Sequence, residues 1–341
     1  MDWQKLKANP GLWQRFQVRS RIIDRTRRFF KRRHFLEVQT PVLTPRLIPE
    51  SYLEYFQTEL LDKMGRKRLA FLTTSPEMWH KKLLAAGSGN IFEITKSFRN
   101  TDIGGHFHNP EFTLLEWYRI NTDYGETMAD CEELIRFLNH GKAKLEYQGQ
   151  VVDISKPFEK LSVIEAFSRF AGMAEDELFD EKKFRNTALK KGYRIKDDDD
   201  WSIIFELILL KEVEPNLGYK KPALLYNFPS QFAPLAKTSQ TDSRVKERFE
   251  LFLFGIELAD AYTELTDPEE QKSRFEEEIS LRKKMGKIDC PPDWDFVAAL
   301  RSGLPPCSGV ALGIDRLVMV FTDQISIDEV LLFSGEEIFA S

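Results

Sequence analysis

Alternating polar and apolar residues between positions 90 and 120 predict two strands joined by a long loop. The strands cover residues 90–98 and 111–120, and the loop between them is polar and holds two glycines and a proline. Such a loop between two alternating runs is typical of an antiparallel hairpin. A side-chain period of two places Phe112, Glu116 and Tyr118 on one face of the second strand. Because burying an unpartnered carboxylate is costly, we expect Glu116 to face a cavity or a cationic group.

The region before this hairpin predicts a helix and then a strand. Apolar residues recur at helical spacing from position 12 to position 33, and a strand over 35–41 ends at Pro41. Arginines and lysines fill the rest of the helix. Its polar face could be solvated, could touch RNA or an acidic protein, or could form part of a dimer interface together with the strand.

A second helix is expected to begin near Ser75, directly after a short strand over residues 68–73. Ser75 at the cap, Pro76 at the first helical position and Glu77 in the first turn all suit a helix start. Capping alone would explain the three residues. The functional alternative is that Ser75 and Glu77 also bind a substrate amine.

The middle of the chain is expected to be mainly helical. A helix and a strand are predicted over residues 123–152, and a helical insertion over about 155–215. Four consecutive aspartates within this insertion, residues 197–200, are interpreted as a solvated loop that caps a helix over residues 201–212.

Two glutamates near position 250 predict a magnesium site. Residues 248–265 read as a hairpin that turns near residues 252–255, which would set Glu250 opposite Glu257 on one face. Two such carboxylates repel unless a cation lies between them, and hard oxygen ligands suit Mg²⁺. The alternative is that one of them pairs with an arginine or lies in solvent. Asp260 and Glu264 add acidity that suits a substrate with ammonium groups.

A third stretch, residues 308–320, reads as a strand that runs directly into a helix. Glycine at Gly313 permits close backbone approach to a ligand, and Arg316 in the first helical turn can reach a phosphate. Arg99, at the end of the first hairpin strand, could hold another phosphate, and an aromatic ring across the loop could stack on a purine. The three stretches together suggest a nucleotide site.

Composition narrows the class of protein. The 341 residues carry a formal net charge of −5, which argues against broad nucleic-acid binding. The three cysteines are far apart and match neither a disulfide framework nor a zinc spacing, which fits a reducing compartment. No apolar run approaches membrane-spanning length, and the N-terminus lacks a signal-peptide pattern. We therefore expect a cytoplasmic protein that does not enter a membrane.

These stretches resemble the catalytic domain of the class II aminoacyl-tRNA synthetases. Residues 98–100 with 108–118 resemble the second signature of the lysyl enzymes, residues 313–316 resemble the third, and the helix and strand ending at Pro41 resemble the first. The similarity runs from about residue 15 to residue 335. The residues before position 12 leave no room for an anticodon-binding OB domain, so the chain is most similar to the truncated paralogues called the EpmA (PoxA/GenX) family. That family ligates (R)-β-lysine to a lysine of elongation factor P.

The resemblance implies a fold, substrates and partners. It implies an α+β class II catalytic fold, with a mostly antiparallel sheet flanked by helices, as a single domain over residues 1–341. It implies ATP and Mg²⁺ as cofactors, an aminoacyl adenylate as intermediate, elongation factor P as partner, a homodimer, and no stable binding of tRNA. Alternatives are a lysyl-adenylate synthetase that serves tRNA or another carrier, and a non-catalytic amino-acid sensor.

The resemblance also implies roles for individual residues. Catalysis would depend on Arg99 at the α-phosphate, Arg316 at the distal phosphates, and Glu250 and Glu257 at Mg²⁺. The nucleotide would further meet Asn100, Thr101, Asp102, Asn109, Phe112, Leu251 and Gly313, with Phe112 stacking on adenine. The amino acid would meet Ser75, Glu77, Glu116, Tyr118, Glu257, Glu264 and Ala311.

Three departures from the family pattern bear on these roles. Thr101 stands where the family has glutamate, so the carboxylate expected near the adenine amino group is displaced or supplied by Asp102. Ala311 stands where the lysyl-tRNA synthetases usually have glycine, and its methyl group would favour an amine displaced by one carbon. Asp260 and Ala261 replace the usual Asn-Gly, which adds a negative charge beside the substrate.

Overall fold

A computed structural model describes residues 3–340 of the chain, which fold into two compact units. Unit 1 combines the residues up to Thr122 with those from Leu265 onward, and unit 2 covers Asp123–Glu264. Each unit holds strands paired into a sheet with helices beside them, which confirms the expected α+β class. The expected single domain with an insertion stays a prediction. Among the residues described, no helix has the length and apolar character needed to cross a membrane.

Unit 1 is built on four strands in the order β1-β5-β6-β13. β5 and β6 are antiparallel with Phe98 opposite Glu111, which confirms the predicted hairpin and both of its strands. β13 is antiparallel to β6, whereas β1 is parallel to β5. The strands span Leu36–Glu37 (β1), Ile91–Phe98 (β5), Glu111–Ile120 (β6) and Cys307–Gly313 (β13).

Helices and 3-10 turns complete unit 1. The helix α3 contacts β6 and α10, while α11 contacts β6 and α2. The elements are α1 (Trp3–Ala8), η1 (Pro10–Leu12), α2 (Trp13–Lys31), α3 (Glu77–Ala85), α9 (Pro268–Lys284), α10 (Trp294–Gly303), α11 (Ile314–Phe321), η6 (Ile327–Glu329) and α12 (Gly335–Phe339).

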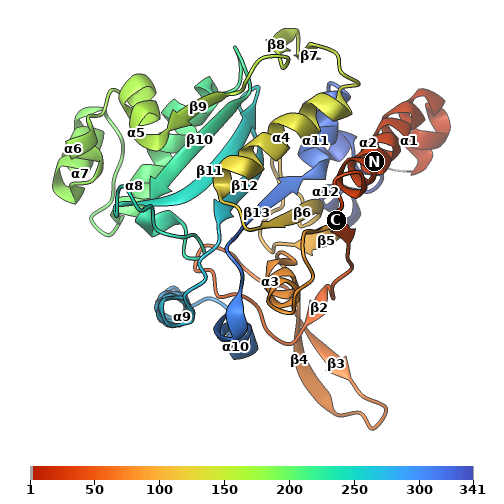
Figure 1. The fold of residues 1–341 in the computed structure, drawn as a ribbon. Helices are drawn as coiled ribbons and strands as arrows, with labels where there is room; N and C mark the ends of the chain where they lie inside the picture. Colours follow the sequence, from red (N-terminus) through yellow and green to blue (C-terminus); the bar gives the residue numbers. More distant parts are fainter. Residues whose placement is uncertain (1–2, 341) are drawn as a thin grey trace. The chain divides into compact units, whose positions relative to one another are not determined.

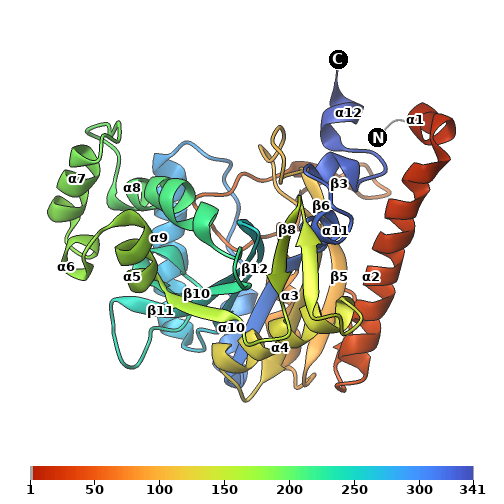
Figure 2. The ribbon, with the colours of Figure 1, turned by 90° about the horizontal axis from the view of Figure 1, so that it is seen from above.

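The helix α2 confirms the helix predicted at the start of the chain. It runs beside β5 (Figure 2), and its Phe30 ring stacks on Phe92 of β5 with the ring centroids 4.9 Å apart. Phe30 also contacts Trp117 of β6, so the apolar face of α2 is held by aromatic packing. The strand expected to end at Pro41 is much shorter than predicted, because only β1 pairs with β5 before the chain leaves the sheet.

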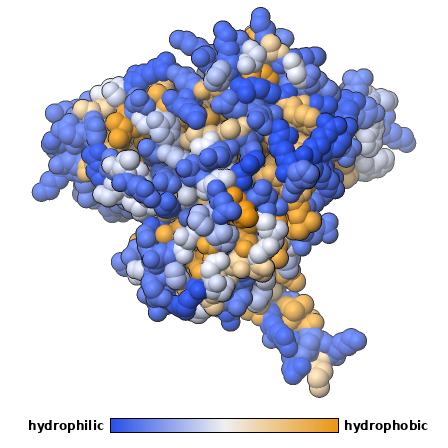
Figure 3. Space-filling view, viewed as in Figure 1, coloured by the Kyte–Doolittle hydropathy of each residue, from blue (hydrophilic) through white to orange (hydrophobic). Residues whose placement is uncertain are grey.

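A separate three-stranded sheet in unit 1 has the order β2-β4-β3. Its strands are Leu43–Thr44 (β2), Gln57–Leu61 (β3) and Lys67–Leu72 (β4), and β4 confirms the strand predicted over residues 68–73. The β3–β4 hairpin projects away from α3 and β5 (Figure 1). Apolar side chains lie on its surface (Figure 3), and they include Leu60, Leu61, Met64 and Leu69.

Unit 2 carries the strand order β12-β11-β10-β9. Its helical part packs an apolar cluster against this sheet, with the Phe167 and Phe205 rings stacked 4.6 Å apart. The strands are Glu159–Ser162 (β9), Ala223–Pro229 (β10), Val245–Leu253 (β11) and Ile256–Thr263 (β12). The other elements are α4 (Tyr124–Leu138), β7 (Lys144–Tyr147), β8 (Gln150–Asp153), α5 (Val163–Ala166), η2 (Phe167–Ala171), α6 (Glu175–Leu178), α7 (Glu181–Lys190), α8 (Trp201–Ile208), η3 (Leu209–Val213), η4 (Glu214–Asn216) and η5 (Ser230–Phe232).

The sequence predicted the helical part of unit 2 well. Asp200 caps α8 by accepting a hydrogen bond from the Ile203 N–H, as expected. The predicted helix over residues 201–212 continues past α8 as the π-helix η3. The helix and strand expected over residues 123–152 are a helix and a two-stranded hairpin, because β7 is followed directly by its antiparallel partner β8.

Candidate active site

Glu116 lies at the centre of a buried polar network in unit 1. Its carboxylate accepts hydrogen bonds from the Ser75 hydroxyl at 2.7 Å, from the Tyr118 hydroxyl at 2.9 Å and from Nδ1 of His80 at 3.1 Å. The other ring nitrogen of His80 binds Glu93 at 2.9 Å. Three of the residues expected at the amino-acid site, Ser75, Glu116 and Tyr118, are therefore brought together.

His80 supplies the cationic group that Glu116 was expected to face. Burial alone would lower the pKa of His80, but the hydrogen bonds to Glu116 and Glu93 raise it to about 9. The ring is therefore an imidazolium at neutral pH, with a proton on each nitrogen. The prediction for Glu116 is confirmed, although the sequence did not identify its partner.

Ala311 stands in the same row of the sheet as these carboxylates. Across the strand ladders Glu93 lies directly opposite Glu116, and Glu116 lies directly opposite Ala311. Directly paired residues of antiparallel strands point to the same face. The methyl group of Ala311 and the two carboxylates therefore share one face of the sheet.

The helix start near Ser75 lies one residue later than predicted. α3 begins at Glu77 with Pro76 at its N-cap, so Pro76 is not the first helical residue. The Glu77 N–H still donates to the Ser75 hydroxyl at 3.1 Å, and that hydroxyl donates to Glu116. Ser75 therefore supports the helix start and also belongs to the polar network. Its contact with a substrate amine stays a prediction. Glu77 is buried and forms an ion pair with Lys81 at 2.5 Å.

Arg99 and Phe112 lie next to each other at the open end of the β5–β6 hairpin. The Arg99 guanidinium carbon is 5.3 Å from the centroid of the Phe112 ring. The Arg99 N–H donates to the Pro110 carbonyl oxygen, which ties the two strand ends together. A guanidinium and a half-buried ring at one strand end are suited to a phosphate and a flat aromatic base.

The loop after Arg99 is held by its backbone. Asn100 pairs with Glu54 in an isolated antiparallel bridge, and Thr101 has a φ of 74°, in the left-handed region that non-glycine residues seldom adopt. Asp102 is half-buried. Glu54, which the sequence did not single out, therefore lies opposite Asn100. Its carboxylate accepts the Tyr55 N–H at 3.3 Å and lies 3.9 Å from Arg282.

Asn109 is used within the fold. Its amide nitrogen donates to the Glu111 carbonyl oxygen at 2.6 Å, and its amide oxygen accepts from the Gly335 N–H at 2.7 Å. A Cβ atom at Gly335 would lie 2.9 Å from the Pro110 ring, so only glycine allows this close approach. Contact of Asn109 with a nucleotide stays a prediction, because both ends of its amide already have backbone partners.

Arg316 reaches back to the hairpin loop from the first turn of α11. Its Nε donates to the Phe107 carbonyl oxygen at 3.1 Å, and its terminal nitrogen lies 3.0 Å from Nε2 of His108. A Cβ atom at Gly313 would meet nothing closer than the Arg316 side chain at 3.9 Å. The fold itself therefore does not demand glycine there, which is compatible with close approach of a ligand.

Asp315 fixes α11 to the rest of unit 1. Its buried carboxylate binds Arg19 of α2 at 2.5 Å and accepts the Thr113 N–H of β6 at 2.6 Å. Arg19 also donates to the Thr113 hydroxyl at 2.7 Å. This triangle positions Gly313 and Arg316 relative to the β5–β6 hairpin.

The acidic residues of unit 2 lie on the β11–β12 hairpin. Its two-residue turn has Phe254 at φ 55° and Gly255 at φ 72°, which is the backbone of a type I′ turn and lies where the sequence predicted it. The predicted register was wrong, because Glu250 lies opposite Asp260, whereas Glu257 lies opposite Phe252. A bulge at this point adds one residue to β12, so Glu257 still shares a face with Glu250.

Charge accumulates around Glu250. Its carboxylate receives a hydrogen bond from Arg248 at 2.7 Å, and Arg248 also binds Asp260 at 2.8 Å. Burial raises the pKa of Glu250 well above its ordinary value; Arg248 opposes this shift, and the carboxylates of Glu257 and Asp260 add to it. The expected alternative of pairing with an arginine is therefore realised for Glu250.

The chemistry of these carboxylates is compatible with the predicted magnesium site, which stays a prediction. Within residues 3–340 no group of three or more His, Cys, Asp or Glu side chains is arranged to hold a metal ion. Mg²⁺ is usually held by one or two carboxylates, with waters and substrate phosphates completing its octahedron. Two glutamates on one face, Glu250 buried and Glu257 half-buried, would suit that requirement.

Two further predicted residues of unit 2 have less distinctive surroundings. Leu251 is buried within β11, opposite Ala259. Glu264 is buried directly after β12, where it forms an isolated bridge with Ala236. Their proposed contacts with substrates stay predictions.

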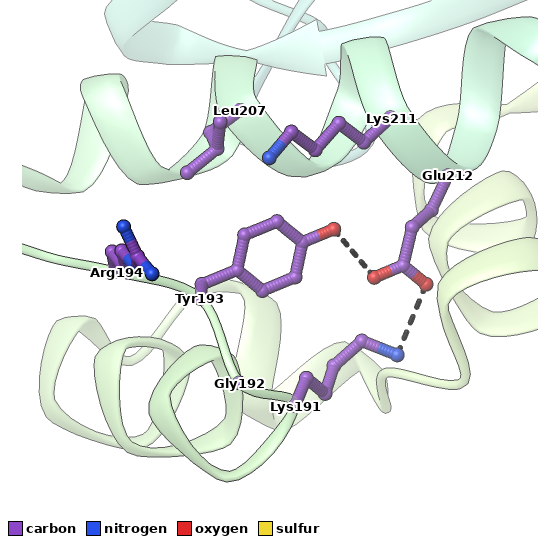
Figure 4. Close-up of a pocket in the computed structure, with 7 residues that line it drawn as sticks. All are labelled: Lys191, Gly192, Tyr193, Arg194, Leu207, Lys211 and Glu212. Carbon is purple, nitrogen blue, oxygen red and sulfur yellow. Dashed lines mark hydrogen bonds and ion pairs between the residues drawn. The ribbon is translucent and has the colours of Figure 1, made fainter.

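A cavity of about 570 Å³ lies in the helical part of unit 2. Figure 4 shows Tyr193 among the residues that line it. The Tyr193 hydroxyl donates to Glu212 at 2.6 Å, and Lys191 binds the other oxygen of the same carboxylate at 3.0 Å. No residue predicted for the site lines this cavity. Its wall is completed by Gly192, Arg194, Leu207 and Lys211.

Sequence reasoning missed His80, Glu93 and Arg248. His80 lies on α3 and Glu93 on β5, so no local spacing relates either of them to Glu116. The only available signal was the physical requirement that a buried carboxylate have a cation, together with a histidine five residues after Ser75. Arg248 precedes Glu250 by two residues, and strand alternation could have placed both on one face.

The chain matches one protein family over nearly its whole length and is similar to several known proteins. The family described as tRNA synthetases class II (D, K and N) matches residues 2–337. The elongation factor P–(R)-β-lysine ligase of Pectobacterium atrosepticum is 41% identical over 98% of each chain. The proteins of the same name from Sodalis glossinidius and Haemophilus ducreyi are 39% and 38% identical. They cover 93% and 98% of this chain, and the matches span 94% and 97% of their own lengths.

Proposed function

Since the chain belongs to the class II tRNA synthetases and, within them, to the elongation factor P–(R)-β-lysine ligases, we propose that it joins (R)-β-lysine to a lysine of elongation factor P with ATP. The observation that carries the proposal is the row of Glu93, Glu116 and Ala311 across three strands. A buried acidic row suits a substrate that carries ammonium groups.

The first step is the activation of the amino acid. Its carboxylate oxygen attacks the α-phosphorus of ATP, the α–β phosphoanhydride bond breaks, and pyrophosphate leaves. Arg99 neutralises charge on the α-phosphate, Arg316 holds the distal phosphates, and Phe112 stacks on the adenine. Such a reaction gains mainly from positioning and from charge neutralisation.

Nucleotide contacts extend along the loop and the strand ends. Asn100, Thr101 and Asp102 follow Arg99 and would approach the base, while Leu251 and Gly313 would admit the nucleotide. Asn109 would line the nucleotide pocket at the loop that its amide anchors through Glu111 and Gly335.

Glu250 and Glu257 would hold Mg²⁺, which when bound neutralises phosphate charge during the displacement. Their own contribution is a carboxylate pair on one face of the β11–β12 hairpin. Arg248 orients Glu250 by its hydrogen bond of 2.7 Å. A cation between the two carboxylates would offset their mutual repulsion.

The amino acid is bound through its amines. The carboxylate of Glu116, with Ser75 and Tyr118 bonded to it, would provide an acceptor for an ammonium group. Glu77, Glu257 and Glu264 would contribute further carboxylates. The methyl group of Ala311 projects from the same face as Glu116. We infer that it fills the space of an α-amine and leaves room for an amine one carbon further from the carboxylate.

The second step transfers the amino acid to the acceptor. The ε-amine of a lysine on elongation factor P attacks the carbonyl carbon of the adenylate, an amide bond forms, and AMP leaves. We propose a homodimer, for which the exposed apolar side chains of the β3–β4 hairpin provide a candidate contact, and a cytoplasmic location, which suits the three buried free cysteines.

Amino-acid-dependent exchange between ATP and labelled pyrophosphate tests the activation step. We expect purified protein to catalyse exchange with (R)-β-lysine much faster than with α-lysine, and to lose it when Mg²⁺ is chelated. Faster exchange with α-lysine would contradict the proposed substrate and favour a lysyl-adenylate synthetase. Absence of exchange with both would favour an amino-acid sensor.

A further inference from the structure

His80 occupies a position in unit 1 that neither catalysis nor substrate contact explains. It is fully buried on α3, its ring nitrogens bind two different carboxylates, and its ring meets that of Tyr118 edge-on at 5.4 Å. Buried side chains of this kind that touch no substrate commonly hold those that do.

The two carboxylates beside His80 need a cation between them. Glu93 and Glu116 are directly opposite on β5 and β6, where paired Cβ atoms lie about 5 Å apart. Both are almost completely buried, at 2% exposure each. Two like charges so placed repel strongly, and without His80 one of them would take up a proton or turn away.

The far end of the cluster is anchored to the chain after α2. Glu93 accepts the Thr40 N–H at 2.9 Å on one oxygen and the Thr40 hydroxyl at 2.8 Å on the other. These two hydrogen bonds hold the Glu93 carboxylate in place, and His80 in turn holds Glu116 by binding both carboxylates. The resulting chain of hydrogen bonds runs from Thr40 through Glu93, His80 and Glu116 to Ser75.

The hydrogen bonds decide which oxygen of Glu116 remains available. Oε1 accepts from both His80 and Tyr118, which uses its two lone-pair directions. Oε2 accepts from Ser75 alone among the contacts described, so it keeps one direction for a further donor. The cluster also keeps one net negative charge, since two carboxylates face one imidazolium.

We propose that His80 is a positioning residue, which, by bridging Glu93 and Glu116, turns Oε2 of Glu116 toward the substrate ammonium group. This inference rests on the proposed function, in which Glu116 binds the amino acid. His80 itself touches neither the amino acid nor ATP. Its loss should weaken amino-acid binding while leaving nucleotide binding and the rate at saturation nearly unchanged.

Three variants test the inference. His80→Gln keeps a neutral hydrogen-bond donor, His80→Leu removes both bonds, and Glu93→Gln leaves His80 in place but removes its anchored charge. Met78→Leu is the matched control, because Met78 is also buried on α3 and this exchange conserves volume. Each protein is assayed by amino-acid-dependent ATP–pyrophosphate exchange and by the rise in melting temperature that (R)-β-lysine and α-lysine each cause.

We expect His80→Gln to raise KM for the amino acid by about tenfold and His80→Leu by more, since a buried acceptor loses its donor. KM for ATP and kcat should stay within about threefold, and the control should match wild type. The double variant Glu93→Gln/His80→Gln should lose less free energy of amino-acid binding than the two single variants lose in sum, because both substitutions break the same chain of hydrogen bonds.

The outcomes separate this inference from the proposed function. If wild type exchanges and His80→Gln keeps its KM for the amino acid, or loses kcat and melting temperature without a selective change in KM, His80 is merely structural and the inference fails. If His80→Leu does not fold, His80→Gln and Glu93→Gln still decide. If wild type neither exchanges nor is stabilised by either amino acid, the proposed function is contradicted, and the inference with it.

Discussion

Ala311 lies directly opposite Glu116 in the antiparallel ladder of β6 and β13, so one methyl group borders the carboxylate at the centre of the polar network. Ala311 is half-buried, whereas Glu116 is almost completely buried. Ala311 stands where the lysyl-tRNA synthetases usually have glycine, and this pairing shows which residue the extra methyl group borders. A small side chain in that place changes the shape of the face on which the substrate amine would lie.

Replacing Ala311 with glycine should shift substrate preference. Removal of the methyl group leaves space for an α-amine, so kcat/KM for α-lysine relative to (R)-β-lysine should rise by about tenfold, in keeping with the usual value of one methyl group in a pocket. Pyrophosphate exchange with the two amino acids measures the ratio. An unchanged ratio would place Ala311 outside the amino-acid pocket.

Glu250→Gln tests the acidic pair of unit 2. The substitution keeps shape and removes the charge proposed to hold Mg²⁺, so the exchange rate should fall by about 10²-fold. Higher Mg²⁺ concentration should restore part of the loss. Glu247→Gln, three residues earlier on β11, serves as the control. Full activity of the Glu250 variant would remove this residue from the catalytic machinery.

The triangle of Arg19, Asp315 and Thr113 supports the fold around Arg316. Arg19→Ala would leave the Asp315 carboxylate buried without its cation, and such losses cost about 3 kcal/mol. Urea denaturation should therefore show a lower free energy of unfolding. Arg21→Ala, an exposed position two residues further along α2, should change it little. Equal stability of the two variants would show that the ion pair does not stabilise the protein.

The raised pKa of His80 predicts a dependence of stability on pH. His80 titrates near 9 in the folded chain and near 6.5 when unfolded, with Glu93, Glu116 and Tyr118 facing the ring. The folded state therefore holds an extra proton between these values, and its stabilisation is complete below pH 6.5 and lost as the pH rises through 9. The loss is on the order of 3 kcal/mol.

Melting curves of wild type and His80→Gln between pH 5 and pH 10 would reveal this contribution as the difference between the two proteins. The gap should close as the pH rises through about 9. Burial also raises the pKa of Glu50, from 4.5 to about 7. The titration of Glu50 therefore changes stability at lower pH than that of His80, and it does so equally in both proteins. Parallel curves over the whole range would contradict the assignment of an imidazolium to His80.

Local patterns in the sequence predicted the parts of the site that depend on local structure. Alternation placed Glu116 and Tyr118 on one face of β6, and the glycine at Gly255 placed the turn of the β11–β12 hairpin. The cost of burying a carboxylate predicted a cation beside Glu116. These inferences needed only residues close together in the chain.

Contacts between distant segments escaped prediction for a physical reason. His80 meets Glu93 and Glu116 because α3 packs on the sheet, and no periodicity encodes that packing. The register of Glu250 was predicted wrongly because the tight turn is centred on Phe254 and Gly255, one residue later along the chain than a pairing of Glu250 with Glu257 requires. A bulge then shifts the pairs beyond Leu251 by one more residue. Asn109 has its amide engaged by Gly335, more than two hundred residues further along the chain.

The most direct test of the proposed ligase activity is the mass of elongation factor P after incubation with the purified protein, ATP, Mg²⁺ and (R)-β-lysine. We predict an increase by one β-lysyl residue, located on a single lysine by fragmentation, and no increase when ATP or the amino acid is omitted. Unchanged elongation factor P, in a reaction where the protein still forms the adenylate, would contradict the proposed acceptor and return the question to tRNA or another carrier.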